Sequence, residues 1–255
     1  MNSCALAAIT DYLDSLLQPA LFQDSALNGL QVESANGSVC RVALAVDAGA
    51  SVITKAIAAR ADMLIVHHGI FWGQCEAIRG TLGSKVRSLL NAGCSLYASH
   101  LPLDAHAEVG NNFELARFFA LEQTQPFFPY KGASIGARGQ TASSLDLAYF
   151  EARAKQLTGA TAPLCLPFGK KSINTVGIVS GAAAAALPIA ASDGLDLLIT
   201  GEPKQNMYHH AKELGINVIC AGHYATETCG VMAVGRKLAT DLGLSTFFID
   251  EPTGI

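Results

Sequence analysis

A pattern of short apolar runs returns at a fixed distance along this chain, and it narrows the possible folds more than any other feature. VALAVDAG, which begins at residue 42, returns as VGIVSGAA at residue 176, and DMLIVHHG at residue 62 returns as DLLITGEP at residue 196. Polar and apolar positions recur together. We interpret this as the duplication of one α/β unit, and chance similarity of two βαβ segments is the alternative interpretation.

The apolar runs have the length and composition of buried strands. They predict strands at 41–46, 63–66, 95–99, 174–179, 197–200, 217–221 and 246–250. The stretches between them predict helices at 51–60, 83–92, 111–119, 145–157, 204–213 and 228–241. Continuous Val, Ile and Leu runs separated by helices are typical of parallel strands covered on both faces. We therefore predict an α/β fold with two similar three-layer α/β domains.

The segment PFFPYKGASIGARGQTAS at 126–143 interrupts this rhythm with Pro and Gly, and predicts a boundary or an extra hairpin between the halves. We place the N-terminal half at 1–124 and the C-terminal half at 125–255. A second recurrence pairs SHLPLD at 99 with GHYATE at 222, which matches His100 with His223 at a distance of 123 residues. The distance is 134 for the earlier runs, so the first half is expected to carry an insertion around FWGQCEAIRGT.

Composition excludes several classes of protein. Of the 255 residues, 50% are hydrophobic and 15% charged, and the net charge is −4 without a basic block, so nucleic acid and anionic membranes are not expected partners. The apolar run at 182–191 is too short to span a bilayer. Asp11 and Asp14 precede the first basic residue, which argues against a secretory signal. Seven cysteines without a C-x-x-C pair indicate reduced thiols, and we expect a cytoplasmic protein.

The seven histidines all lie within 67–106 and 209–223. His67, His100 and His223 each follow an apolar run. Ligands of parallel α/β sheets lie beyond the carboxyl ends of the strands, so three imidazoles are expected at such ends. For His106 and His210 a structural or surface role is the favoured interpretation, and for Phe71 and Trp72 a place in the core or an interface.

Carboxylates accompany the histidines. Asp104 lies four residues after His100, and Glu227 lies four residues after His223. Histidine with Asp or Glu is a ligand set of divalent transition metals. Adjacent side chains on an extended backbone point apart, so His67 and His68 suit two ions better than one, and we expect a two-metal centre with a bridging carboxylate. The alternative is that each of these side chains is structural.

Four segments together resemble one family. LIVHHGIFWG, SHLPLDAHAEVGNN, TGEPKQNMYHHAKE and AGHYATE are similar to the Nif-three-like GTP cyclohydrolase I type 2 homologues, which include YbgI-like bacterial proteins. The resemblance implies a dinuclear metal centre between two similar α/β domains and a toroidal homohexamer with its sites facing the inner cavity. The family's metal ligands fall on His67, His68, Asp104, His223 and Glu227, with Glu227 as the bridge. Tyr224 stands where the family usually has a second histidine, which weakens any transfer of substrate.

These expectations lead to two hypotheses of function. The first is a metal-dependent hydrolase that uses a metal-bridging hydroxide, of the GTP cyclohydrolase type or acting on another cyclic amidine or nucleotide. We expect His100 to orient groups or shuttle protons without binding metal, and Glu202 to be the alternative base. The two divalent ions are Zn, Fe, Mn, Co or Ni, which this ligand set does not distinguish. The second hypothesis is a non-catalytic protein that binds or delivers metal through partners.

Overall fold

In the computed structural model, the described residues 2–159 and 162–255 form two compact units. Unit 1 comprises Met1–Leu103 and Val231–Glu251, and unit 2 comprises Asp104–Gly230 and Pro252–Ile255. The last long helix, α9 (His223–Leu242), contributes residues to both units. The boundary expected between residues 124 and 125 falls within strand β7 (Glu122–Tyr130).

Unit 1 is built on a five-stranded sheet in the order β13-β4-β5-β6-β2. The strands β13 (Ser245–Phe248), β4 (Arg41–Asp47), β5 (Met63–His68) and β6 (Ser95–Ala98) run parallel, and β2 (Gly29–Val32) is antiparallel at the edge. The predicted strands at 41–46, 63–66, 95–99 and 246–250 are confirmed. The short pair β1 (Cys4–Ala5) and β3 (Ser38–Val39) lies outside this sheet.

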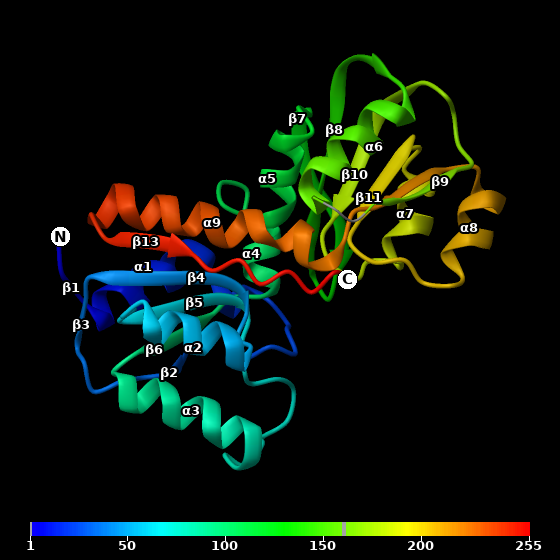
Figure 1. The fold of residues 1–255 in the computed structure, drawn as a ribbon. Helices are drawn as coiled ribbons and strands as arrows, with labels where there is room; N and C mark the ends of the chain where they lie inside the picture. Colours follow the sequence, from blue (N-terminus) through cyan, green and yellow to red (C-terminus); the bar gives the residue numbers. More distant parts are fainter. Residues whose placement is uncertain (1, 160–161) are drawn as a thin grey trace. The chain divides into compact units, whose positions relative to one another are not determined.

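Helices cover both faces of the unit 1 sheet (Figure 1). On one face, α2 (Ala50–Ala58) and α3 (Gly80–Ala92) bury Val52, Ile53 and Leu89 against strand residues such as Leu64 and Val66. On the other face lie α1 (Leu6–Leu17) and the later part of α9. Two short helices also occur in this part of the chain. They are a 3₁₀ helix at Pro19–Leu21, which follows α1, and α4 (Leu101–Ala105), which follows β6. This burial on both faces explains the unbroken apolar runs.

Unit 2 repeats this plan with a six-stranded sheet in the order β7-β8-β10-β11-β12-β9. The strands β10 (Ile173–Val179), β11 (Leu197–Thr200) and β12 (Asn217–Cys220) are parallel, and β9 (Leu164–Pro167) is antiparallel to β12. On one face, α5 (Asn111–Phe118) and α6 (Leu147–Thr158) bury Phe119 and Phe150. The helices α7 (Ala186–Ser192) and α8 (Met207–Leu214) lie on the other face (Figure 1).

The segment at 126–143 forms a hairpin, as one of the two expectations had it. Strand β7 pairs with β8 (Ala133–Leu145), which extends the sheet of unit 2. Lys131 and Gly132, the two turn residues, both have positive φ, which matches the twist of a two-residue hairpin. Within the FFPY segment at 127–130, Phe127 and Phe128 are buried and Tyr130 is exposed.

The duplication is confirmed by matching structure in each unit. Asp62 accepts hydrogen bonds from the backbone N–H groups of Cys40 and Arg41, at 2.8 and 2.9 Å. Asp196, 134 residues later, accepts from Asn174 and Thr175 at 3.0 and 3.1 Å. In both units a carboxylate at the start of one parallel strand therefore fixes the start of its neighbour.

The expected match of His100 with His223 is wrong by one position. In unit 1, Leu64 pairs with Leu96, and in unit 2, Leu198 pairs with Val218. The third parallel strand therefore recurs after 122 residues, not 123, and His100 corresponds to Gly222. His100 precedes α4, whereas His223 is the first residue of α9, so the two imidazoles do not occupy equivalent positions.

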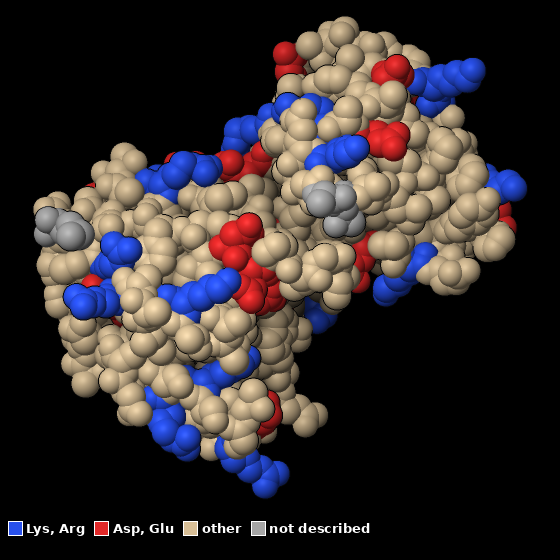
Figure 2. Space-filling view, in the orientation of Figure 1, with Lys and Arg blue, Asp and Glu red and all other residues tan. Residues whose placement is uncertain are grey.

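Charged side chains do not gather into a basic surface on the face shown in Figure 2, where Lys and Arg are spread singly or in small groups. The expectation that nucleic acid is not a partner stays a prediction. In the part of the chain that the structure describes, no helix has the length and apolar character needed to cross a bilayer.

Candidate metal-binding groups

Three imidazoles meet at the carboxyl end of the unit 1 sheet. His67 and His68 are the last residues of β5, and His100 follows β6, the strand beside it. The ring centroids of His67 and His68 are 4.6 Å apart, and that of His100 lies 5.1 Å from His67 and 5.6 Å from His68. One ligating nitrogen from each ring lies within 4.8 Å of the others, so the three together could hold a metal ion.

Each of these rings is oriented through its Nδ1 atom. His67 Nδ1 is 2.9 Å from the Ser99 carbonyl oxygen, and His68 Nδ1 is 2.9 Å from Asp47 Oδ1. His100 Nδ1 is 2.9 Å from Asp24 Oδ1. An oxygen acceptor at Nδ1 fixes the tautomer that presents Nε2 as a ligand, which is the usual arrangement behind metal-binding histidines. The three side chains therefore fit a divalent transition metal.

The expectation that His67 and His68 point apart is wrong. Both residues belong to β5, but their ring centroids are only 4.6 Å apart, and the two rings are anchored from different neighbouring segments. Ser99 belongs to the segment after β6, and Asp47 is the last residue of β4. The two anchors turn both rings to the same end of the sheet.

Asp24 holds His100 from a loop that sequence reasoning missed. Its carboxylate accepts hydrogen bonds from the backbone N–H groups of Ala26 and Leu101 and from the Asn28 amide, besides its contact with His100. Burial raises the pKa of Asp24, but the hydrogen bonds from His100 and Asn28 outweigh it and hold the pKa well below its usual range. The carboxylate stays ionised at neutral pH and fixes the His100 ring.

Unit 2 brings together the two predicted carboxylates and the third predicted histidine ligand. Asp104 is buried in α4, and its Oδ1 accepts hydrogen bonds from Asn111 Nδ2 and Ser180 Oγ, both at 2.9 Å. Glu227 is buried in α9, one turn after His223, and its Oε1 is 3.1 Å from His223 Nε2. A carboxylate oxygen of Asp104 lies within 4.8 Å of one of Glu227, so this unit also gathers metal-ligand chemistry.

His223 lies between two carboxylates. Its Nδ1 contacts Glu202, and its Nε2 faces Glu227. Burial lowers the pKa of His223, but the hydrogen bonds and charges of Glu227 and Glu202 outweigh it and raise the pKa to about 9. Glu202 therefore orients His223 in the way that Asp24 orients His100, and its predicted role as a base stays a prediction.

Two glycines make room for these groups, and sequence reasoning did not single them out. A Cβ on Gly181, whose φ is +62°, would lie 2.4 Å from Glu227 Oε1. A Cβ on Gly201 would lie 2.8 Å from the His223 Cα. Both glycines follow parallel strands, β10 and β11, where the recurring VSGAA and TGEP segments begin. A glycine beside a recurrent polar position was the signal that could have found them.

The remaining predicted positions have structural surroundings. The His106 Nδ1 accepts hydrogen bonds from the backbone N–H groups of Glu108 and Val109, which confirms a structural role. His210 is exposed on α8, as expected. Tyr224 is buried with 7% exposure in the first turn of α9. Trp72, expected in the core or an interface, is 42% exposed and lies over the histidines of unit 1.

Fold and side chains together define an internally duplicated α/β protein whose strand ends carry histidine and carboxylate groups that could bind metal. A family model described as Duf34/NIF3 (NGG1p interacting factor 3) matches residues 4–254, and the chain belongs to this family. It is 41% identical to the "GTP cyclohydrolase 1 type 2 homolog" of Deinococcus radiodurans over 96% of this chain and 92% of the relative. It is 42% identical to the protein of the same name from Pyrococcus abyssi over 97% and 98% of the two chains.

Solved structures agree with this membership. The crystal structure of TTHA1606 from Thermus thermophilus matches with a TM-score of 0.91 at 42% identity, covering 99% of this chain and 100% of that one. The structural-genomics structure of protein ybgI, of unknown function, matches with a TM-score of 0.91 at 30% identity over the same shares. The predicted family and the predicted α/β fold with two sheet-containing halves are confirmed.

Proposed function

We propose that this protein is a metal-dependent hydrolase that binds two divalent ions per chain. The proposed ligand set is the one that the sequence motifs predict: His67, His68, Asp104, His223 and Glu227. One observation supports the choice of His67 and His68 above all others, namely that each of these two rings is anchored through Nδ1 to an oxygen acceptor. A ring held in this way presents Nε2 as a ligand, whereas a histidine that only fills space has no need of the arrangement.

When bound, such ions lower the pKa of a coordinated water to near neutrality and polarise the substrate. The protein's own side chains would orient the ligands and transfer protons. Asp24 fixes the His100 ring, and His100 is the proposed orienter or proton shuttle. Glu202 fixes His223, and Asn111 with Ser180 fixes the Oδ1 atom of Asp104. Cyclic amidines and nucleotides are the proposed substrates.

The polar groups behind the proposed ligands favour an enzyme over a metal carrier. Asp47 and Ser99 support ligands in unit 1, and Asn111 and Ser180 support Asp104 in unit 2. A carrier must release its ion, and rigidly oriented ligands slow that release, whereas catalysis requires a fixed geometry.

Metal content tests the ligand set. Elemental analysis of gently purified protein is expected to approach two divalent ions per chain, and Glu227→Gln is expected to lose at least one of them. Glu213→Gln, an exposed residue of α8, is the matched control and should keep both. Full retention of both ions at unchanged affinity in Glu227→Gln would contradict the bridging role.

The role of His100 needs a separate variant. His100→Ala is expected to keep both ions and to lose about 10²–10⁴-fold in rate, the range typical of acid–base groups, on any substrate found by screening phosphoesters, cyclic amidines and nucleotides. The loss of one ion equivalent would make His100 a ligand instead. If the variant kept both ions and full activity, His100 would have only a structural role.

A further inference from the structure

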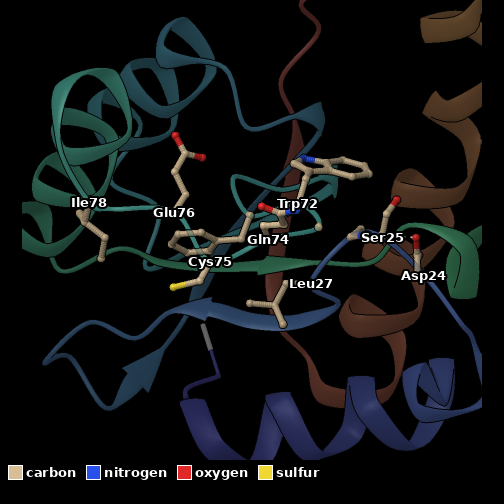
Figure 3. Close-up of a pocket in the computed structure, with 11 residues that line it drawn as sticks. Asp24, Ser25, Leu27, Trp72, Gln74, Cys75, Glu76 and Ile78 are labelled. Carbon is tan, nitrogen blue, oxygen red and sulfur yellow. Dashed lines mark hydrogen bonds between the residues drawn. The ribbon is translucent and has the colours of Figure 1, made fainter.

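A pocket of about 500 Å³ opens in unit 1 (Figure 3). Its walls are the loop at 24–27 and the long loop after β5, the insertion that the sequence recurrence predicted. Figure 3 shows Ile78 and Glu76 on one side of the pocket, Gln74 and Trp72 near its middle, and Ser25 and Asp24 on the other side. The size lies within the range of small-molecule sites.

The two loops are held together before any ligand arrives. The Leu27 backbone N–H donates to the Phe71 carbonyl oxygen at 3.1 Å, the Gly73 N–H donates to the Ser25 carbonyl oxygen, and Ala26 forms an antiparallel bridge with Trp72. The Trp72 indole N–H donates to the Gly69 carbonyl oxygen at 3.1 Å. The aromatic wall is therefore fixed although Trp72 is 42% exposed, and a preformed wall reduces the entropy cost of binding.

The pocket also borders the candidate metal ligands. The Trp72 ring centroid lies 5.0 Å from that of His100 and 5.8 Å from that of His68. Asp24, which lines the pocket, is the carboxylate that fixes His100. A molecule in the pocket would thus lie next to the side chains that the proposed function uses.

The lining selects the chemistry of the ligand. Leu27, Phe71, Trp72 and Ile78 offer flat and aliphatic surface, and both charged lining residues, Asp24 and Glu76, are acids. Asp24 already accepts four hydrogen bonds, so Glu76 is the carboxylate left for a ligand, with the Gln74 amide close by. A tryptophan face attracts cations and an acidic wall repels anions, so a phosphate or carboxylate does not suit this pocket.

We propose that this pocket binds an uncharged or cationic planar ring that stacks on Trp72 and donates N–H groups to Glu76. The ring would be the recognised part of the substrate of the metal centre, and this second statement rests on the proposed function. An N–H donor pair such as an amidine matches a carboxylate with two parallel hydrogen bonds.

Binding to the metal-free full-length protein tests the pocket without testing hydrolysis. Trp72 is the only tryptophan of the chain, so its emission reports directly on the pocket. The probes are benzamidine, benzyl alcohol and benzoate, which share one ring and differ in charge. We expect a saturable change in emission with benzamidine and about tenfold weaker binding of benzoate, because one exposed carboxylate attracts the first and repels the second.

Two matched variants locate the effect. Glu76→Gln is expected to weaken benzamidine about three- to fivefold and to leave benzyl alcohol unchanged, whereas Glu33→Gln, an exposed residue of unit 1 outside the pocket, should change neither. Equal binding of benzoate and benzamidine, or equal behaviour of the two variants, would overturn the proposal. The proposal would also be overturned if Trp72 emission did not respond to the probes but changed with protein concentration. That result would indicate that the exposed residues around the pocket contact a second copy of the chain. Benzamidine binding by the metal-free protein, together with elemental analysis that finds no metal in the gently purified protein, would keep the pocket and refute the metal-dependent function.

Discussion

Among single residues, Gly181 tolerates substitution least, because both its backbone conformation and the nearby Glu227 side chain exclude a Cβ atom. Its φ is +62°, and an added Cβ would approach Glu227 Oε1 to 2.4 Å. Gly194 has a φ of +71° with no atom within 4 Å of an added Cβ. Comparing Gly181 with Gly194 therefore distinguishes the effect of backbone strain, which both positions share, from the effect of crowding against Glu227, which only Gly181 has.

We expect Gly194→Ala to lose about 1–2 kcal/mol of stability through strain alone and to keep its metal content. Gly181→Ala should lose more stability and also displace Glu227, so that at least one ion is lost. Thermal unfolding and elemental analysis of the two variants measure these effects. Unchanged metal content in Gly181→Ala would mean that Glu227 can move without cost.

His223 gives a pH dependence to the metal-free protein. Its pKa in the folded chain is about 9, above the ordinary value of 6.5. The folded state therefore binds the proton more tightly than the unfolded state, so this contribution is fully present below pH 6.5 and is lost as the pH rises through 9. Its size is on the order of 2 kcal/mol.

Unfolding of the metal-free protein between about pH 6 and 8 measures this contribution, because the buried thiols of Cys94 and Cys220, whose pKa values are raised above the ordinary 9.0, add a slope of the same sign only at higher pH. Stability should fall with rising pH in the natural chain, and His223→Gln should remove most of that slope. A variant that keeps the full slope would assign the pH dependence to other groups.

At the scale of elements, Asp62 and Asp196 fix the relative start of neighbouring parallel strands in the two units. Burial raises the pKa of Asp196, but hydrogen bonds from Lys170 and from the backbone of Asn174 and Thr175 outweigh it and lower the pKa. Its contribution to stability is therefore present above the ordinary pKa and is lost as the pH falls through the lowered one.

Asp196→Asn and Asp62→Asn are each expected to cost about 2 kcal/mol, since each removes charge-assisted hydrogen bonds to two backbone N–H groups. Asp193→Asn is the control, because Asp193 is exposed and pairs only at the surface with Arg138, and its change should stay within about 0.5 kcal/mol. Denaturant unfolding at neutral pH compares the three. Equal midpoints for Asp196→Asn and Asp193→Asn would show that the carboxylate does not hold the strands.

For the whole molecule, assembly into a homohexamer stays a proposal that derives from the family resemblance. Light scattering at micromolar concentration is expected to give six times the chain mass of 26.6 kDa, about 160 kDa. Exposed apolar side chains such as Leu21 and Leu27 offer surface for contacts between copies, whereas the FFPY segment offers only Tyr130 and Pro129. A mass of a single chain would refute the assembly.

The strands, the duplication and the types of side chain at the strand ends could all be predicted from the order of residues along the chain. Apolar runs in a chain of this size have to be buried, and parallel strands put their carboxyl ends at one edge, so the strand ends before His67 and His100 had to share that edge. Segments with little periodicity were missed, among them β2, β9 and α7, because packing against the sheet decides their conformation.

The groups that orient the histidines, and the glycines that make room for the carboxylates, could be identified only from contacts between segments far apart in the sequence. Asp24 lies 76 residues before its partner His100, and Gly181 lies 46 residues before Glu227, so no local pattern links either pair. The same limit explains the error of one residue in matching His100 with His223. The two similar motifs can be aligned at a distance of either 122 or 123 residues from sequence alone. The hydrogen bonds between neighbouring strands allow only 122, because they determine which residues pair.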